Sequence, residues 1–184
     1  MKFLKQGTLL DKFKAKIRGT IDIDRLIKNG LVVGNNFHAQ EGVIIDPGHC
    51  WLIEIGNNVT LAPRCHVLAH DASTKYWLGY TKVGTVKIGN NVFIGASTVI
   101  LPGSYIDDNV IIGASSLVKG YVPSGVYFGN PLRFYCSLEE YLMKEKDKMK
   151  TSPLFGEEYV IGKISKERKS SMVQKLTKTI GYIR

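Results

Sequence analysis

The chain has 184 residues, of which 44% are hydrophobic and 10% aromatic, so its size and composition are those of one globular domain and exclude a disordered chain. Its three cysteines are too few, and odd in number, for a disulfide framework. No apolar run approaches the length of a membrane span, and the N-terminus lacks the apolar core of a signal peptide. We therefore expect a cytoplasmic protein in a reducing compartment.

The net charge of +9 is concentrated at the two ends of the chain. Residues 1–30 carry eight Lys/Arg and three Asp/Glu, and residues 134–184 carry eleven and seven, whereas residues 31–133 carry six of each. A nucleic-acid-binding protein concentrates basic residues on its recognition surface, so this distribution argues against nucleic acid as a partner. The basic ends are typical of solvated surface, and peripheral contact with an anionic membrane or a lipid-linked glycan is the alternative.

Three segments are expected in chain order. Residues 1–30 form a mostly helical lead-in, residues 31–133 a repeat domain, and residues 134–184 a basic C-terminal helical arm. In the arm, one helix begins near Leu138, and a second covers about residues 165–179 with Ser165 at its N-terminus. The apolar residues that share one helical face in the lead-in are Leu10, Phe13 and Ile17.

The repeat domain is marked by aliphatic residues at intervals of six. A period of six fits neither a helix nor a single strand, so it indicates strand, corner, strand, corner. Units of this size bury an apolar face only by stacking, which predicts an all-β fold, a parallel β-helix. Before Ile55 the repeat is less regular, although Ile27, Val33, Ala39 and Ile45 keep the interval of six. The regular positions are Ile55, Leu61, Val67, Ile88, Ile94, Ile100, Ile106, Ile112 and Val118, each followed four residues later by a small or β-branched residue in all but one case.

The repeat is interrupted once, between Val67 and Ile88, where the register breaks. The excluded loop, residues 71–85, follows His70 and is rich in aromatic residues. Loops on a rigid scaffold often carry function, so this loop is where we expect a site.

Two stretches of the repeat resemble a known family. They read IGNNVTLAPRCHVLAHD and VKIGNNVFIGASTVILPGSYIDDNVIIGASSLVKGYVPSGVYFGNPLRF. Together they resemble the hexapeptide-repeat acyltransferases, in particular the maltose, galactoside and glycan O-acetyltransferase branch. The resemblance implies a left-handed parallel β-helix, a homotrimer with active sites between neighbouring chains, and acetyl-CoA as the donor.

The resemblance also implies roles for individual residues. His70 corresponds to the general base that removes the proton of the attacking hydroxyl, work that suits a neutral imidazole. Ala96 and Ala114 lie along the coenzyme A groove, where the backbone at Ala96 supplies a donor to the thioester oxygen. Lys119 and Arg133 are candidates for the coenzyme A phosphates, although a plain surface role is the alternative for Lys119.

Acceptor binding is predicted for two regions. Gln40 aligns with an acceptor-binding Asn of sugar acetyltransferases. In the excluded loop, aromatic rings can stack on the face of a sugar, and a lysine can attract an acidic sugar or a phosphate. Asp71 either orients His70 or caps a turn. The loop residues predicted to contact the acceptor are Asp71, Lys75, Tyr76, Trp77 and Tyr80.

The sequence thus predicts an acetyl-CoA-dependent transferase that acetylates a hydroxyl of a carbohydrate in glycan or polysaccharide biosynthesis. The alternatives are N-acetylation of an amino-sugar nucleotide, drug acetylation, and a trimeric scaffold without catalysis. A zinc site is a further alternative, because His49 and His66 are almost one coil apart and His66 is four residues from His70. We expect no metal, since the histidine motifs of zinc-binding members of this fold are not matched.

Overall fold

The computed structural model describes residues 21–184, so the predicted helical face of Leu10, Phe13 and Ile17 lies outside the described residues. The chain divides into two compact units, one ending at Leu138 and the other covering Glu139–Arg184. In the first unit, a short helix α2 (Ile23–Lys28) precedes the strands, and the Asp22 side chain caps it by accepting a 3.0 Å hydrogen bond from the Arg25 N–H.

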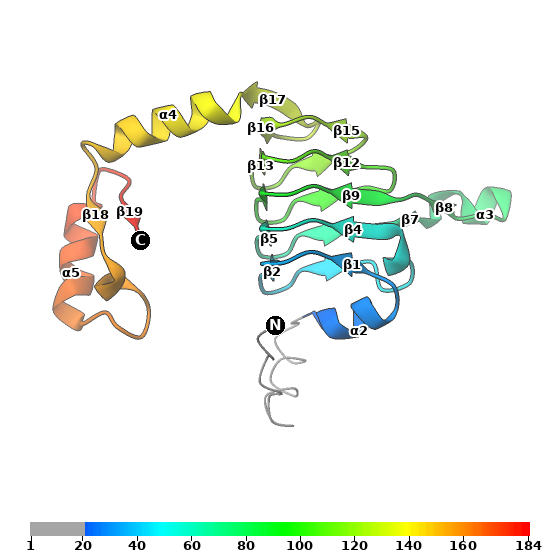
Figure 1. Cartoon of the computed structure of the whole chain (residues 1–184), viewed down its shortest axis with the longest axis horizontal. Coiled ribbons are helices and arrows are strands. Elements are labelled where there is room, and N and C mark those ends of the chain that lie inside the picture. The colour runs from blue at the N-terminus through cyan, green and yellow to red at the C-terminus, as the bar shows by residue number, and fades with distance from the viewer. Residues whose placement is uncertain (1–20) are drawn as a thin grey trace. The chain divides into compact units, whose positions relative to one another are not determined.

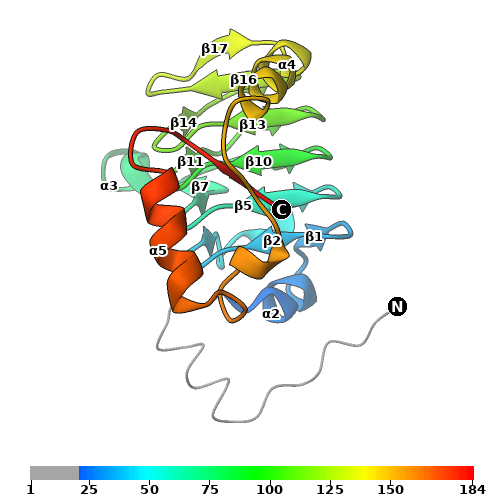
Figure 2. The ribbon, with the colours of Figure 1, turned by 90° about the vertical axis from the view of Figure 1, so that its left-hand side faces the viewer.

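Most strands of the first unit form a prism of three parallel sheets (Figure 1). Sheet A contains β1 (Val32–Val33), β4 (Ile53–Ile55), β9 (Val86–Ile88), β12 (Tyr105–Ile106) and β15 (Tyr121–Val122). Sheet B contains β2 (His38–Ala39), β5 (Val59–Leu61), β10 (Val92–Ile94), β13 (Val110–Ile112) and β16 (Gly125–Phe128), with β17 (Arg133–Cys136) antiparallel to β16 (Figure 2). Sheet C contains β3 (Ile44–Ile45), β6 (His66–Val67), β11 (Val99–Ile100) and β14 (Leu117–Val118).

The chain visits sheets A, B and C in turn and then returns to A, so each coil adds one strand to every sheet. This order confirms the predicted parallel β-helix. It also defines three corners, A–B, B–C and C–A, at which the chain passes from one sheet to the next. These corners decide which functional residues can meet.

The interior of the prism is the predicted ladder. Each of the nine regular positions from Ile55 to Val118 is no more than 1% exposed, and the small residues Thr98, Ser104 and Ser116 beside them are also buried. One early position was predicted wrongly: Ile27 is 46% exposed, because it belongs to α2 and not to a coil of the prism. The ladder is fully buried from Ile45 onward.

Asparagines build the A–B corner. Asn58, Asn91 and Asn109 have φ angles of 55°, 55° and 60°, in the left-handed region that Asn tolerates better than most residues. Their side chains also form a ladder, in which Asn58 Nδ2 donates to Asn91 Oδ1 at 2.9 Å and Asn91 Nδ2 to Asn109 Oδ1 at 3.0 Å. The corner therefore depends on both backbone conformation and side-chain pairing.

Two substitutions of Asn91 should separate these contributions. Asn91→Gly keeps the positive φ accessible and removes only the ladder, so we expect a loss of about 1 kcal/mol in the free energy of unfolding. Asn91→Ala removes the ladder and also strains the backbone, so it should cost about 1–2 kcal/mol more. Urea unfolding at one protein concentration measures both, and equal losses for the two variants would contradict a backbone contribution.

The interruption of the repeat is a hairpin at the C–A corner. Strands β7 (His70–Asp71) and β8 (Lys82–Val83) pair antiparallel, and the connection contains a 3-10 turn η2 (Ala72–Thr74) and helix α3 (Lys75–Leu78). The hairpin projects from the prism (Figure 1). Its aromatic side chains are largely exposed, with Tyr76 at 87%, Trp77 at 79% and Tyr80 at 81%.

The second unit contains two helices and two short strands. Helix α4 (Leu138–Met149) begins at the predicted residue, and α5 (Lys166–Lys175) is capped by Ser165 as predicted but ends earlier than residue 179. Strands β18 (Leu154–Phe155) and β19 (Tyr182–Ile183) pair parallel, with the 3-10 turn η3 (Glu157–Tyr159) after β18. No helix within residues 21–184 is long and apolar enough to cross a bilayer.

Candidate active site

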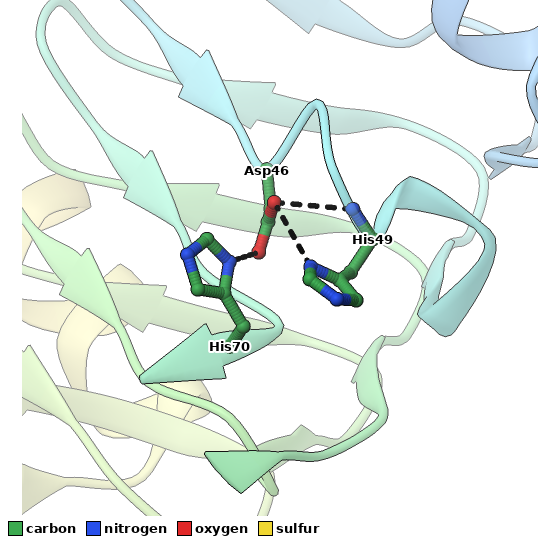
Figure 3. Close-up of side chains that lie close together, drawn as sticks. All are labelled: Asp46, His49 and His70. Atoms are coloured by element: carbon green, nitrogen blue, oxygen red, sulfur yellow. Dashed lines mark hydrogen bonds and ion pairs between the residues drawn. The ribbon is translucent and has the colours of Figure 1, made fainter. Parts of the chain in front are cut away.

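The predicted base lies at the C–A corner. His70 follows sheet C strand β6 and opens the hairpin, and its side chain is 39% exposed. Its Nδ1 is hydrogen-bonded to Oδ2 of Asp46, which follows β3 at the same corner one coil earlier (Figure 3). Because a carboxylate only accepts, Nδ1 must carry the hydrogen, and Nε2 is left with its lone pair for a substrate. This is the tautomer that a general base requires.

Asp46 is held from several directions. Its side chain is completely buried, Oδ2 also accepts from the Ala69 N–H at 3.1 Å, and Oδ1 accepts from the N–H groups of Gly48 at 3.0 Å and His49 at 3.2 Å. Burial raises the pKa of Asp46, but the hydrogen bonds from His70, Ala69 and Gly48 together outweigh it, so the pKa lies below its usual value. The carboxylate is therefore a fixed anion that orients His70.

A second imidazole adjoins the pair. The ring of His49 lies 4.8 Å from that of His70 and 5.4 Å from the indole of Trp51, measured between centroids. Its Nδ1 is 3.8 Å from Asp46 Oδ1, too far for a hydrogen bond, and has no hydrogen-bond partner within the described part of the chain. The ring of His49 thus adjoins the pair without a hydrogen bond to it, whereas its backbone N–H donates to Asp46.

Asp71 has the second of the two roles predicted for it. Its carboxylate accepts from the Ser73 N–H at 2.8 Å, which caps η2, and pairs with Lys82 Nζ at 2.5 Å. The hydrogen bond from Lys82, followed by that from Ser73, lowers the pKa of Asp71 to about 2. Asp71 therefore fastens the base of the hairpin, and the carboxylate that orients His70 is Asp46.

The other predicted residues are divided between two corners. Gln40, Ala96 and Ala114 follow sheet B strands and lie at the B–C corner, whereas His70 and Lys119 follow sheet C strands and lie at the C–A corner. Within one chain, the structure therefore does not bring Ala96 or Gln40 to His70. Arg133, exposed at the start of β17, belongs to the strand that closes sheet B.

The B–C corner is narrow and contains a cavity. A Cβ added to Gly95 would lie 2.4 Å from the backbone nitrogen of Ala114, so neighbouring coils leave no space for a larger residue there. Beside it, a cavity of about 470 Å³ is lined by Glu41, Gly42, Pro63, Arg64, Ala96 and Ser97. Arg64, which the sequence analysis did not single out, brings a cation to this corner.

The zinc alternative required His49, His66 and His70 to lie together. His66 pairs with Ile44 and Val99 in sheet C, and it is Asp46 that completes a group with His49 and His70, in which the ligand atoms lie within 4.8 Å of one another. Both oxygens of Asp46 already accept hydrogen bonds from His70 and the backbone, as described above. The arrangement is thus that of a hydrogen-bonded pair with an adjoining ring.

Sequence reasoning missed Asp46 and considered His49 only as a zinc ligand. The sequence did contain a signal for Asp46, because this residue directly follows Ile45, a position of the six-residue repeat. Ile45 pairs with Val67, and this pairing places Asp46 at the same corner as His70. The turn between β3 and β4 makes this coil longer than six-residue units allow, so the pairing cannot be read from the sequence period.

Comparisons with known proteins identify the family of the chain. Residues 85–120 match the family model described as bacterial transferase hexapeptide (six repeats). The chain is 34% identical over 141 residues to protein CapG of Staphylococcus aureus, covering 72% of this chain and 80% of that protein. It is 37% identical over 109 residues to the galactoside O-acetyltransferase of Escherichia coli K12, covering 55% of this chain and 51% of the relative.

Among solved structures, the maltose O-acetyltransferase of Clostridium difficile 630 aligns with a TM-score of 0.51 at 28% sequence identity, over 69% of this chain and 83% of that chain. The chain belongs to the hexapeptide-repeat family of bacterial transferases, and the predicted resemblance is confirmed. It nevertheless spans only about half the length of several curated relatives that it matches.

Proposed function

We propose that this chain is an acetyl-CoA-dependent O-acetyltransferase that acetylates a hydroxyl of a carbohydrate acceptor in glycan or polysaccharide biosynthesis. The observation that carries the proposal is the pairing of His70 with the buried Asp46 at the C–A corner. The relatives named galactoside and maltose O-acetyltransferase support the same chemistry.

In the proposed reaction, His70 Nε2 takes the proton of the acceptor hydroxyl as its oxygen attacks the acetyl carbonyl. Acetyl-CoA, the co-substrate, supplies the activated acetyl group as a thioester. A backbone donor at Ala96 stabilises the charge that develops on the carbonyl oxygen. His70 then returns the proton to the sulfur that leaves. Direct transfer fits the site, because Cys65 is buried and burial raises the pKa of its thiol.

The B–C corner fits the co-substrate. Its small residues keep the backbone open to a ligand, and the cavity lined by Ala96 and Ser97 offers the room for one. We assign the pantetheine arm to Ala96 and Ala114, and the phosphates to Lys119 and Arg133. Arg64, in the cavity next to Ala96, is a further cation for that end of the groove.

The division of these residues between two corners supports a homotrimer. We propose that the prisms are left-handed and that a cyclic trimer places the C–A corner of one copy, with His70, against the B–C corner of the next, with Ala96. Light scattering should then report about three times the chain mass of 20.5 kDa.

Mixed trimers test this shared site. His70→Ala and Ala96→Trp, which would block the groove, should each be inactive as pure proteins. Co-refolded at equal amounts, they should recover about one quarter of the wild-type activity, because a random quarter of the sites pairs an intact His70 with an intact Ala96 from the neighbouring chain. If both residues served a site within one chain, no mixture would contain a complete site and no activity would return.

On the acceptor side, we propose that Gln40 of the neighbouring copy and the hairpin residues Lys75, Tyr76, Trp77 and Tyr80 contact the sugar. The exposure of the aromatic rings on the hairpin supports this role. Asp71 contributes by holding the hairpin through Lys82. The comparisons give no support to the predicted membrane contact, and the proposed function does not need it.

The decisive experiment is a screen of acceptors with acetyl-CoA and thiol detection. Mono-, di- and trisaccharides of glucose and galactose, their amino sugars and the nucleotide-linked forms should be compared. Thiol release that depends on a sugar hydroxyl supports the proposal, and transfer only to amines would favour the N-acetyltransferase alternative. We place the reaction in the cytoplasm, in keeping with the three free buried cysteines.

A further inference from the structure

An exposed tryptophan next to the catalytic pair has no part in the core. Trp51 is the middle residue of the 3-10 turn η1 (Cys50–Leu52), and its side chain is 57% exposed although the flanking Cys50 is completely buried. A large apolar ring held in solvent loses the stabilisation that burial would give it. Its position, two residues from His49 at the C–A corner, suggests a use in binding.

The turn that carries Trp51 is rigidly anchored. Cys50 Sγ lies 3.4 Å from the carbonyl oxygen of Asn29 and 3.6 Å from that of Leu26, so it ties the turn to the end of α2. Gly30, at a φ of 103°, lies so close that a Cβ added to it would be 2.8 Å from the Cβ of Trp51. The indole is therefore presented by fixed backbone, which limits the entropy lost when a ligand binds.

His49 connects Trp51 to the reaction centre. Its ring contacts both, with its centroid 5.4 Å from that of the indole and 4.8 Å from that of the His70 ring. The backbone N–H of His49 donates to Asp46, and its Nδ1 is buried 3.8 Å from Asp46 Oδ1, so a ligand can reach only the exposed part of the ring, which leaves 32% of the side chain accessible. An aromatic face with an adjoining imidazole is the mixed lining that suits a sugar, which offers C–H faces and hydroxyl edges.

We propose that Trp51 and His49 form a carbohydrate subsite that binds the sugar unit next to the one being acetylated. The inference rests on the proposed function and deepens it. Since the ring of His49 contacts both Trp51 and His70, a sugar stacked on the indole would be the neighbour of the unit whose hydroxyl reaches His70. The preferred acceptor therefore contains at least two linked sugars.

The test compares acceptors of different length with matched variants. Glucose, maltose and maltotriose form one series, and galactose and lactose a second. The wild-type enzyme should use the disaccharides about 10-fold better than the monosaccharides, in kcat/KM. Trp51→Ala should remove that gain, by raising KM, and leave the monosaccharide values unchanged. Trp51→Phe, which keeps an aromatic face, should retain most of it. A fold difference of 10 corresponds to the free energy expected of one aromatic stacking contact.

Two further variants make the result specific. Ile161→Ala alters another exposed apolar side chain, 96% exposed in the second unit, and should change nothing. Trp77→Ala reports on the hairpin. A loss of the disaccharide gain with Trp77→Ala but not with Trp51→Ala would overturn the subsite, as would dissociation of the Trp51→Ala trimer in light scattering. Those outcomes would leave the proposed O-acetyltransferase activity standing. The proposed function itself is contradicted if the wild-type enzyme transfers acetyl neither to these sugars nor to any other carbohydrate of the acceptor screen.

Discussion

Replacing His70 by alanine should lower turnover by about 10²–10⁴-fold, the usual contribution of a general base. The imidazole is 39% exposed, so its removal should leave the fold and the dissociation constant for acetyl-CoA nearly unchanged. Single-turnover kinetics at saturating acetyl-CoA measure the chemical step directly, and calorimetry measures the affinity.

His38→Ala is the matched control for this experiment. His38 is exposed on sheet B and hydrogen-bonded to Asn36 at 2.9 Å, away from the C–A corner, so the control should retain turnover within about threefold. A His70→Ala enzyme that keeps most of its turnover would remove the base from the mechanism. An equal loss in both variants would point to a general effect on folding.

Much of the prism could be predicted, because the place of a residue in the six-residue period determines whether its side chain points inward and how large it can be. Ile94, Ile100 and Ile106 repeat at a constant interval and are completely buried. Corner residues such as Asn91 follow from the positive φ that the turn requires. Local chemistry was therefore sufficient wherever successive coils have equal length.

The partner of His70 could not be predicted in this way. Later coils are regular, with Ile94 opposite Ile112 and Asn91 bonded to Asn109 at a separation of 18 residues. The first coil is longer, with Ile45 opposite Val67 and Asn36 bonded to Asn58 at a separation of 22. The added residues belong to the turn that carries His49 and Trp51. Which residues it brings to the corner depends on its three-dimensional path, and periodicity does not describe that path.

Periodicity also could not predict which corner of the prism each candidate site residue occupies. The resemblance in sequence assigned Ala96 and His70 to the same reaction without indicating where they lie. Only the assignment of their strands to sheets B and C shows that a single chain keeps them apart. Assembly was predicted from resemblance, and the topology now supplies a physical argument for it.

Asp46→Asn should lower turnover as strongly as the loss of the base, by about 10²–10⁴-fold. The carboxamide is nearly isosteric with the carboxylate, but its N–H₂ group would donate to His70 Nδ1 and so move the imidazole hydrogen to Nε2, where it blocks proton abstraction. Asp71→Asn is the matched control, because its carboxylate is adjacent in sequence yet pairs with Lys82. At saturating acceptor, that control should keep its turnover within about threefold.

The substitution of Asp46 should also change the dependence of stability on pH. The carboxamide leaves backbone donors of Gly48, His49 or Ala69 without an acceptor in a buried place, a cost of about 1–3 kcal/mol at neutral pH. Because the pKa of Asp46 is lowered in the folded protein, its contribution is fully present above the unfolded value, about 3.9, and is lost as the pH falls through the folded value. Urea unfolding of wild-type and Asp46→Asn proteins should thus give a difference that shrinks as the pH falls below about 4. A difference that instead grows below about pH 4 would mean that the pKa of Asp46 is raised in the folded protein, and His70 would then lack the anion that orients it.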